Sequence, residues 1–241
     1  LKEKLQAVGV RSINNIVDIT NFICHELGQP LHAFDAAKIT GNKVIVKNLP
    51  EGTPFVTLDG VERKLSARDL MICNAEEPMC IGGVFGGTKS GVTESTTAIF
   101  LESAYFSPAS IRKTGTFHTL KTDASFRFER GTDPNMPIYA LKRAALLILE
   151  VAGGHIASEV VDIYPNPIPN HEVAVKYRNI DRLIGKSLDR DLIKQILTSL
   201  DIEIQNETPE GFLASVAPYR VDVTREADIV EEILRIYGFD N

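Results

Sequence analysis

Apolar residues recur at helical spacing near the start of the chain. They are Ile16, Ile19, Ile23 and Leu27. Positions three or four apart share one side of a helix, and Gly28 is the residue type that most often ends one. The spacing therefore predicts a helix over 14–27.

Short apolar runs that are typical of strands follow this helix. They are Lys43–Lys47, Phe55–Leu58, Val61–Leu65, Leu70–Cys73, Met79–Val84 and Ala98–Leu101. Asp59-Gly60 predicts a turn between the second and third runs. Two helices are then expected to begin at Ser107-Pro108 and Asp133-Pro134, where a polar cap precedes a proline. The second should end near Ala152, before Gly153-Gly154. Strands first and helices later favour an α+β fold over a parallel βαβ sheet.

Three alternating prolines in Tyr164–Asn170 predict an extended linker, because proline donates no backbone hydrogen bond. We place the domain boundary there, giving domains 1–165 and 166–241. The second domain is predicted to contain a strand, two helices, a hairpin and a last helix. These are His171–Tyr177, Ile180–Ile184, Asp189–Leu200, the hairpin strands Asp201–Gln205 and Gly211–Val216, and Arg225–Tyr237 with Thr224 as its N-cap. This order resembles winged-helix modules, which is a likeness of fold alone.

Composition excludes several classes of protein. The 241 residues are 44% hydrophobic and 24% charged, which is ordinary for a globular protein, and no run approaches the ~18 apolar residues of a membrane span. A net charge of −6 argues against bulk binding of nucleic acid. Three cysteines without a C-x-x-C pair fit a reducing cytoplasm. The opening Leu1-Lys2-Glu3-Lys4, without Met, indicates an internal piece of a longer chain.

Gly82–Lys89 is rich in glycine but does not match a phosphate loop, because Thr88 precedes Lys89 where that motif requires the reverse. Two interpretations remain for Gly86. It could form a pocket wall where a Cβ would block a flat ligand, or it could belong to a plain tight turn.

Two titratable residues occupy apolar surroundings. His32 lies in PLHAFD and could be an ordinary core histidine, bonded for instance to Asp35, or a ligand contact. Glu102 follows a strand-like run, so we expect it to be partly buried. A buried carboxylate usually has an Arg or Lys partner, and without one a role in recognition is favoured.

The sequence shows no recognisable pair of catalytic nucleophile and base. Ser103 and Ser125 lack the G-x-S-x-G motif that surrounds a nucleophilic serine in many hydrolases. The most basic neighbourhood combines Arg112, Lys113, His118 and Lys121 with TDASFRFERG at 122–131. Its phenylalanines make a contact with the end of a nucleic acid conceivable. Near the C-terminus, the acids Asp222, Asp228, Glu231 and Glu232 fit either a Mg²⁺ site or a solvated face, with Glu231 paired to Arg235.

Five stretches together resemble the phenylalanyl-tRNA synthetase beta subunits of bacteria. They are RSINNIVDITN at 11–21, ELGQPLHAFD at 26–35, LESA at 101–104, ASFRFERG at 124–131 and EEILRIYG at 231–238. They cover essentially the whole chain in the order of the family. The resemblance implies an α+β chain, with a mixed-sheet B3/B4 editing domain followed by a small winged-helix-like B5 domain.

The resemblance also implies an activity: hydrolysis of tRNA(Phe) wrongly charged with tyrosine, while aminoacylation and its ATP belong to the alpha subunit of an α2β2 cytoplasmic enzyme. It places His32 and Arg11 as catalytic residues. It places tyrosine, the editing-site ligand, among Glu102, Thr20, Asn21, Gly86, Thr122 and Ala124. It assigns Asp222, Asp228, Glu231 and Glu232 to magnesium in the full enzyme.

These assignments lead to a physical hypothesis. Glu102 would accept a hydrogen bond from the phenol of tyrosine, and the small Gly86 and Ala124 would leave room for its ring. His32 and Arg11 would orient the ester and a water that attacks it. The alternative is a non-catalytic module that binds tRNA and assembles subunits, with a vestigial pocket.

Overall fold

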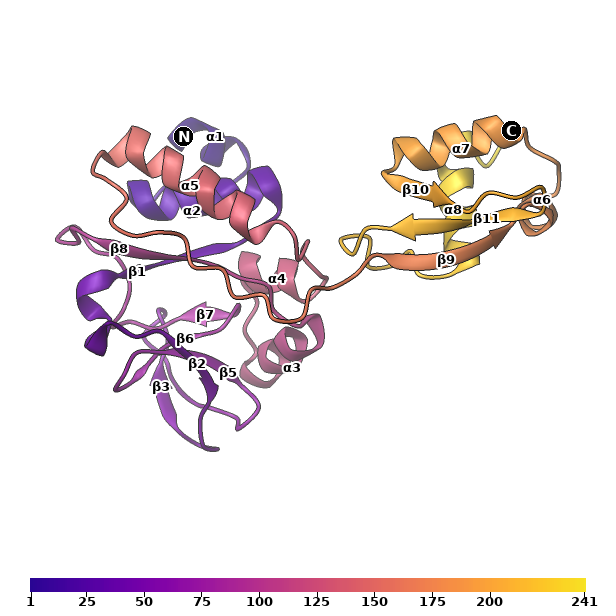
Figure 1. Cartoon of the computed structure of the whole chain (residues 1–241). Coiled ribbons are helices and arrows are strands. Elements are labelled where there is room, and N and C mark those ends of the chain that lie inside the picture. Colours follow the sequence, from indigo (N-terminus) through magenta and orange to yellow (C-terminus); the bar gives the residue numbers. More distant parts are fainter. The chain divides into compact units, whose positions relative to one another are not determined.

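A computed structural model describes all of residues 1–241. The chain divides into two compact units, Leu1–Asp162 and Ile163–Asn241, which are described separately. Both combine helices with antiparallel strands, so the α+β class is confirmed (Figure 1). Every strand pair is antiparallel, which differs from the mixed sheet expected of the first domain. None of the helices combines the length and hydrophobicity that a membrane-spanning segment needs.

The first unit contains five helices and eight strands. The helices are α1 (Lys2–Ala7), α2 (Asn15–Leu27), α3 (Pro108–His118), α4 (Asp123–Phe128) and α5 (Pro137–Ala152). The strands are β1 (Leu31–Asp35), β2 (Ile45–Asn48), β3 (Pro54–Val56), β4 (Glu62–Lys64), β5 (Leu70–Cys73), β6 (Pro78–Ile81), β7 (Phe85–Gly86) and β8 (Ile99–Ser103). Two short 3₁₀ turns, Ala36–Lys38 and Thr40–Asn42, lie between β1 and β2.

These strands form three separate sheets. A β1–β8 ribbon carries α2 and α5 on one side, while the four-stranded sheet β2-β5-β6-β7 lies on the other (Figure 1). The hairpin β3–β4 is the third sheet. Ile19 and Ile23 of α2 pack with Ala140 and Ala144 of α5 on the helical side. A larger apolar cluster that includes Phe34 fills the other side. The ribbon therefore lies between two cores.

The predicted helix over 14–27 is confirmed, with Asn14 as N-cap and Gly28 in the left-handed conformation at its end. The predicted start at Asp133-Pro134 is wrong, because Asp133 accepts the backbone N–H of Asn135 in a turn and α5 begins only at Pro137. Four further elements, α1, β1, β7 and α4, were not predicted from the sequence patterns.

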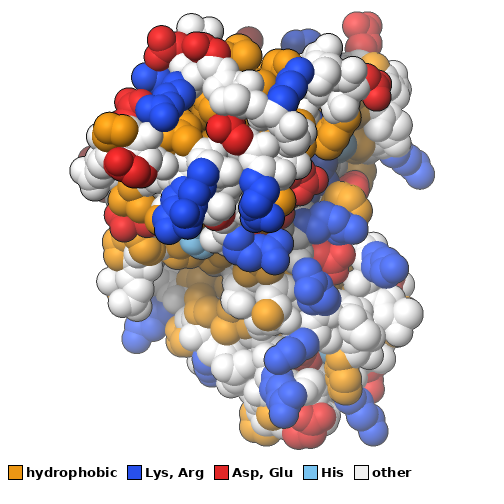
Figure 2. Space-filling model, turned by 90° about the vertical axis from the view of Figure 1, so that its right-hand side faces the viewer, with side chains coloured by type: hydrophobic (Ala, Val, Ile, Leu, Met, Phe, Trp, Pro, Cys, Tyr) orange, Lys and Arg blue, Asp and Glu red, His pale blue; other side chains and the backbone are white.

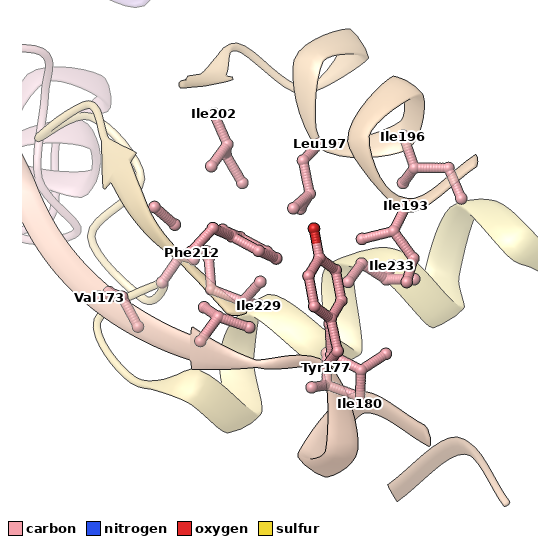
Figure 3. Packing of buried hydrophobic residues seen from close by; sticks show 14 of the residues in the cluster. Val173, Tyr177, Ile180, Ile193, Ile196, Leu197, Ile202, Phe212, Ile229 and Ile233 are labelled. Carbon is pink, nitrogen blue, oxygen red and sulfur yellow. The ribbon is translucent and has the colours of Figure 1, made fainter. Parts of the chain in front are cut away.

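The second unit has the predicted order of elements. It contains β9 (His171–Lys176), α6 (Tyr177–Ile184), α7 (Arg190–Ser199), β10 (Ile202–Gln205), β11 (Gly211–Val216) and α8 (Glu226–Tyr237). The sheet order is β10-β11-β9. Figure 3 shows Tyr177 and Phe212 among the aliphatic side chains that form its core. Helix α8 is capped by Arg225 rather than by the predicted Thr224.

Candidate active site

The β1–β8 ribbon brings two of the candidate residues together. Its register places His32 directly opposite Glu102. Directly opposed residues of an antiparallel pair point to the same face, with Cβ atoms about 4.5–5.5 Å apart. Residues seventy positions apart in the sequence are therefore neighbours on one surface.

Strand alternation decides which core this pair faces. Leu31 and Leu101 contact the cluster between α2 and α5. His32 and Phe34 lie on the opposite face of β1, and Phe34 belongs to the larger cluster. The His32 and Phe34 rings are in edge contact, with centroids 4.4 Å apart. The pair thus faces the four-stranded sheet and its glycine-rich segment.

The expected bond between His32 and Asp35 is wrong. Residues three apart on a strand point to opposite faces. Asp35 instead accepts the backbone N–H of Ala37 at 3.0 Å and the hydroxyl of Thr96 at 2.8 Å.

Neither member of the pair has a polar partner. The Nε2 atom of His32 and the Oε2 atom of Glu102 are both buried without a hydrogen bond, and no Lys or Arg forms an ion pair with Glu102. Two interpretations are thus wrong: His32 is not a core histidine with satisfied hydrogen bonds, and Glu102 is not paired with an Arg or Lys. Buried polar groups without partners are uncommon and costly, so the pair is suited to bind something that supplies the missing bonds.

Burial shifts the titration of both groups. It raises the pKa of Glu102 to about 7 and lowers the pKa of His32 to about 4, because desolvation disfavours the charged form of each. At neutral pH the imidazole is therefore uncharged, and the carboxyl group gives up its proton less readily than a solvated one. Perturbed groups of this kind concentrate at functional sites.

Gly86 lies beside His32. It lies in strand β7, opposite Cys80, so it is not part of a turn. A Cβ built on it would lie 2.9 Å from Cδ1 of Leu58 and 3.1 Å from Cε1 of His32. The turn belongs to Gly83, whose φ is +69°. The plain tight turn is therefore wrong for Gly86, which instead packs closely against Leu58 and His32.

Helix α4 fixes Thr122 and Ala124 near the same segment. The Thr122 hydroxyl donates to the carbonyl of Val84 at 2.9 Å and accepts the N–H of Ser125 at 3.0 Å, so it caps the helix and fastens it to the chain two residues before Gly86. Ala124 packs, partly buried, against the cluster that contains Phe34.

The other candidates are less closely tied to the pair. The Thr20 hydroxyl donates to Val17 within α2. Thr20 shares a face of that helix with Cys24. Burial raises the pKa of the Cys24 thiol to about 11, while the charge of Arg127 lowers this pKa and the charge of Asp123 raises it. Asn21 is half-buried and Arg11 is exposed, and no hydrogen bond joins either residue to His32 or Glu102.

Sequence reasoning missed two residues at the site. Leu58, half exposed, lies over Gly86, and its N–H donates to the Gly86 carbonyl at 3.0 Å. Cys80 is buried, and the charge of Glu102 adds to burial in raising the pKa of its thiol. Both are ordinary strand residues in the sequence, so only the sheet register could reveal them.

Two surface hollows of the first unit lie elsewhere. One is lined by Arg68, Phe106 and Ser110 at the start of α3. The other is lined by Lys4, Phe22 and others where α1, α2 and α5 meet. Neither includes a candidate residue, so neither changes the assignment.

The four acids near the C-terminus do not gather into a metal site. No group of three or more His, Cys, Asp or Glu residues is arranged to hold an ion. Asp228 accepts the backbone N–H groups of Thr224 and Arg225 and pairs with the Arg225 guanidinium at 2.8 Å. Glu232 pairs with Arg220 and Arg235, which corrects the expected pairing of Glu231 with Arg235.

Asp222 and Glu231 are the two acids that stay exposed. Taken alone, the residues present do not fit a magnesium ion.

His118 does not belong to the exposed basic neighbourhood. It is buried, and its Nε2 atom lies 2.6 Å from the carboxylate of Asp69, which also accepts the hydroxyl of Thr114. This network fastens α3 to the loop before β5, and its residues are satisfied.

Comparisons with known proteins agree with this division of the chain. A B3/4 domain model matches residues 1–153, and a tRNA synthetase B5 domain model matches residues 173–239. The chain is 61% identical over its full length to the phenylalanine–tRNA ligase beta subunit of Bacteroides thetaiotaomicron and 54% identical to that of Porphyromonas gingivalis, and it spans 29% of each.

A solved structure is also similar to this chain. It is an N-terminal fragment of the phenylalanyl-tRNA synthetase beta subunit from Pyrococcus horikoshii, with 16% identity and a TM-score of 0.46. The similarity covers 92% of this chain and 65% of that one.

Proposed function

This chain belongs to the family of phenylalanine–tRNA ligase beta subunits, and from that premise we propose that its first unit hydrolyses tRNA(Phe) wrongly charged with tyrosine. The observation that carries the proposal is the half-buried pair of His32 and Glu102 beside Gly86, whose Nε2 and Oε2 atoms are buried and have no hydrogen-bond partner. The aminoacylation reaction and its ATP would belong to a partner alpha subunit in an α2β2 cytoplasmic enzyme.

Recognition would rest on Glu102. A site selecting phenylalanine rejects an analogue with one extra hydroxyl only by ~10². A second site whose buried acceptor requires that hydroxyl can discriminate in the opposite direction by ~10⁴–10⁵. Glu102 has the properties this requires, because its Oε2 is buried and unbonded. The tyrosine phenol would donate to it, whereas a phenylalanine ring would leave it desolvated and unmatched.

Hydrolysis would use a water molecule held next to the ester. Water attacks the carbonyl carbon, the bond from that carbon to the ribose oxygen breaks, and tyrosine leaves while the ribose oxygen regains a proton. With a pKa near 4, His32 is a weak base at neutral pH. Its open Nε2 would therefore orient the water or the ester, and the exposed Arg11 would bind the nucleotide end. Thr20 and Asn21, on α2, would contact the bound substrate.

The experiment that tests this function is release of free tyrosine from Tyr-tRNA(Phe) by the full-length ligase that contains this chain. Release well above the spontaneous rate, with Phe-tRNA(Phe) left intact, is the expected result. A rate equal to that of buffer would favour the alternative, a non-catalytic module that binds tRNA and assembles subunits. The partner-free Glu102 speaks against that alternative, because a vestigial pocket gains nothing from an unmatched buried acid.

Substitution of Gly86 by alanine should lower kcat/KM for Tyr-tRNA(Phe) about tenfold, because the new methyl group intrudes beside His32 and misplaces the ester. The fold should survive, since Leu58 is half exposed and its end can move away. Gly91→Ala is the matched control, because its Cβ would meet Leu58 at an ordinary 3.8 Å. Equal losses in both variants, measured by tyrosine release, would remove Gly86 from the pocket.

The second unit would serve assembly rather than catalysis. Magnesium would be held in the full enzyme only if a partner supplies further oxygen ligands, because Asp228 and Glu232 are already paired with arginines. Mg²⁺ typically takes one or two protein carboxylates, with water and phosphate completing its shell. Asp222 and Glu231 would be the carboxylates available to bind the magnesium ion.

Isothermal titration of residues 1–241 with Mg²⁺ should therefore give no saturable heat below millimolar concentration. The same titration of the assembled ligase, compared with an Asp222→Asn variant, would show whether the partner completes a site. Tight binding by the isolated chain would contradict the ion pairs seen for Asp228 and Glu232.

A further inference from the structure

Helix α4 presents an exposed aromatic ring next to the candidate pocket. Phe126 is 53% exposed, and the Arg130 guanidinium stacks over its ring at 3.6 Å from the centroid. The Arg130 side chain is itself 55% exposed, so solvent reaches the stacked pair. Neither residue takes part in the hydrolysis described above, so this stacked pair calls for a different role.

Hydrogen bonds hold this pair in place. Arg130 donates to the Phe126 carbonyl at 3.0 Å and to the carboxylate of Glu129 at 2.8 Å. Arg112, on α3, donates to the Glu129 carbonyl at 2.8 Å. The stacked ring and guanidinium therefore form a preorganised platform supported by two helices, and a ligand would lose little entropy by stacking on it.

The platform lies in the most basic part of the chain. Residues 112–130 carry five basic side chains, Arg112, Lys113, Lys121, Arg127 and Arg130, against the acids Asp123 and Glu129. The whole chain has a net charge of −6, so this local excess of positive charge runs against the average. Figure 2 displays one face of the whole chain, on which Lys and Arg side chains lie among acidic and hydrophobic ones.

Aromatic rings among basic side chains suit single-stranded nucleic acid, because bases stack on the rings while phosphates pair with the cations. We propose that this surface, formed by Phe126, Arg130 and Arg112, binds the unpaired nucleotides that precede the terminal adenosine of tRNA. The proposal rests on the proposed function, which brings that adenosine to the pocket.

The position on α4 supports this occupant. Thr122 and Ala124 in the first turn border the glycine-rich segment. Phe126 lies one turn after Thr122, about 6 Å farther along the helix and on the same side of it, whereas Ala124 faces the core. A nucleotide strand that leaves the pocket along α4 would reach the ring directly.

The test compares two substrates in the full-length ligase, Tyr-tRNA(Phe) and the small ester tyrosyl-adenosine, which has no nucleotides to stack. Phe126→Ala should lower kcat/KM for Tyr-tRNA(Phe) about tenfold and leave tyrosyl-adenosine unchanged. Phe126→Tyr should retain the activity. Tyr139→Ala is the control, since Tyr139 is 61% exposed on α5 and has no place in the proposal.

A direct binding measurement separates this proposal from the proposed function. Fluorescence anisotropy with a labelled RNA oligonucleotide ending in CCA should show about tenfold weaker binding to Phe126→Ala and weaker binding with rising salt. Unchanged binding, or equal loss on both ester substrates, overturns the proposal even if hydrolysis is real. A defect confined to assembly with the alpha subunit would assign the surface to a protein and also overturn it.

Discussion

Substitution of Glu102 by alanine is expected to lower kcat/KM for hydrolysis of Tyr-tRNA(Phe) by about 10²-fold, because the variant loses a hydrogen bond to a buried charged group. The rate for Phe-tRNA(Phe) should stay the same or rise, since a phenylalanine ring no longer faces an unmatched carboxylate. Selectivity between the two esters, measured side by side by release of the amino acid, should therefore collapse.

Two comparisons make this result specific. Glu62→Ala removes an exposed glutamate on β4 and should leave both rates unchanged. Glu102→Gln keeps the shape of the side chain and an acceptor oxygen, so its activity should lie between those of wild type and Glu102→Ala. If Glu102→Ala hydrolyses the tyrosine ester normally and with unchanged selectivity, Glu102 is not the group that recognises tyrosine.

The helix over 14–27 was predictable because its signals are local. A cap at Asn14, apolar residues at helical spacing and Gly28 at the end lie within one short stretch. The hairpin of the second unit was likewise predictable from the alternation in Asp201–Gln205 and Gly211–Val216, with Pro209 and Gly211 marking its loop, and its strands appear as β10 and β11.

Errors arose where two local signals competed. Asp133-Pro134 carries a valid helix start, yet the Asp133 side chain closes a turn with Asn135 first. In PLHAFD the apolar and polar residues do not alternate cleanly, since Ala33 and Phe34 are both buried, one on each face of the ribbon. A strand buried on both faces has no period of two to detect, so β1 was missed.

The candidate site depended on information that no local pattern contains. The sequence identified Glu102 as a carboxylate in apolar surroundings, but it could not show whether an Arg would pair with it. The β1–β8 register settles this, because it places His32 rather than a cation opposite Glu102. Strand pairing between distant segments is non-local, so resemblance to a family supplied what spacing could not.

The same unmatched pair should have a measurable effect on stability. Glu102 has its pKa raised by burial to about 7 in the folded chain, against an ordinary value of 4.5. The folded state therefore holds this proton more tightly than the unfolded state. The contribution of this proton to the free energy of unfolding is fully present below pH 4.5 and is lost as the pH rises through 7. At about 1.4 kcal/mol per pKa unit, the loss is about 3 kcal/mol.

His32 acts in the opposite direction. Burial lowers its pKa from 6.5 to about 4, so its stability is fully present above pH 6.5 and lost as the pH falls through 4. Over the interval from about pH 4.5 to 6.5 the two effects nearly cancel. The wild-type chain should consequently show little pH dependence from this pair, although both groups are strongly perturbed.

Single substitutions should expose each effect. Glu102→Gln leaves only His32 to titrate, so its free energy of unfolding should match that of wild type near pH 4 and exceed it by about 3 kcal/mol at pH 8. Urea denaturation of both proteins from pH 4 to pH 8 measures this difference, and Glu62→Gln is the exposed control. A difference that does not change with pH would mean that Glu102 titrates normally, as a solvated carboxylate does.

The combination of the two measurements is more informative than either alone. If a glutamate stabilises the fold, its substitution should lower the stability of the protein and change the activity only indirectly. Glu102 is expected to do the reverse, because its replacement by glutamine should make the protein more stable at neutral pH and less active. A residue that is retained at a cost to folding is one whose unmatched carboxylate serves a ligand, since the fold itself supplies no partner for it.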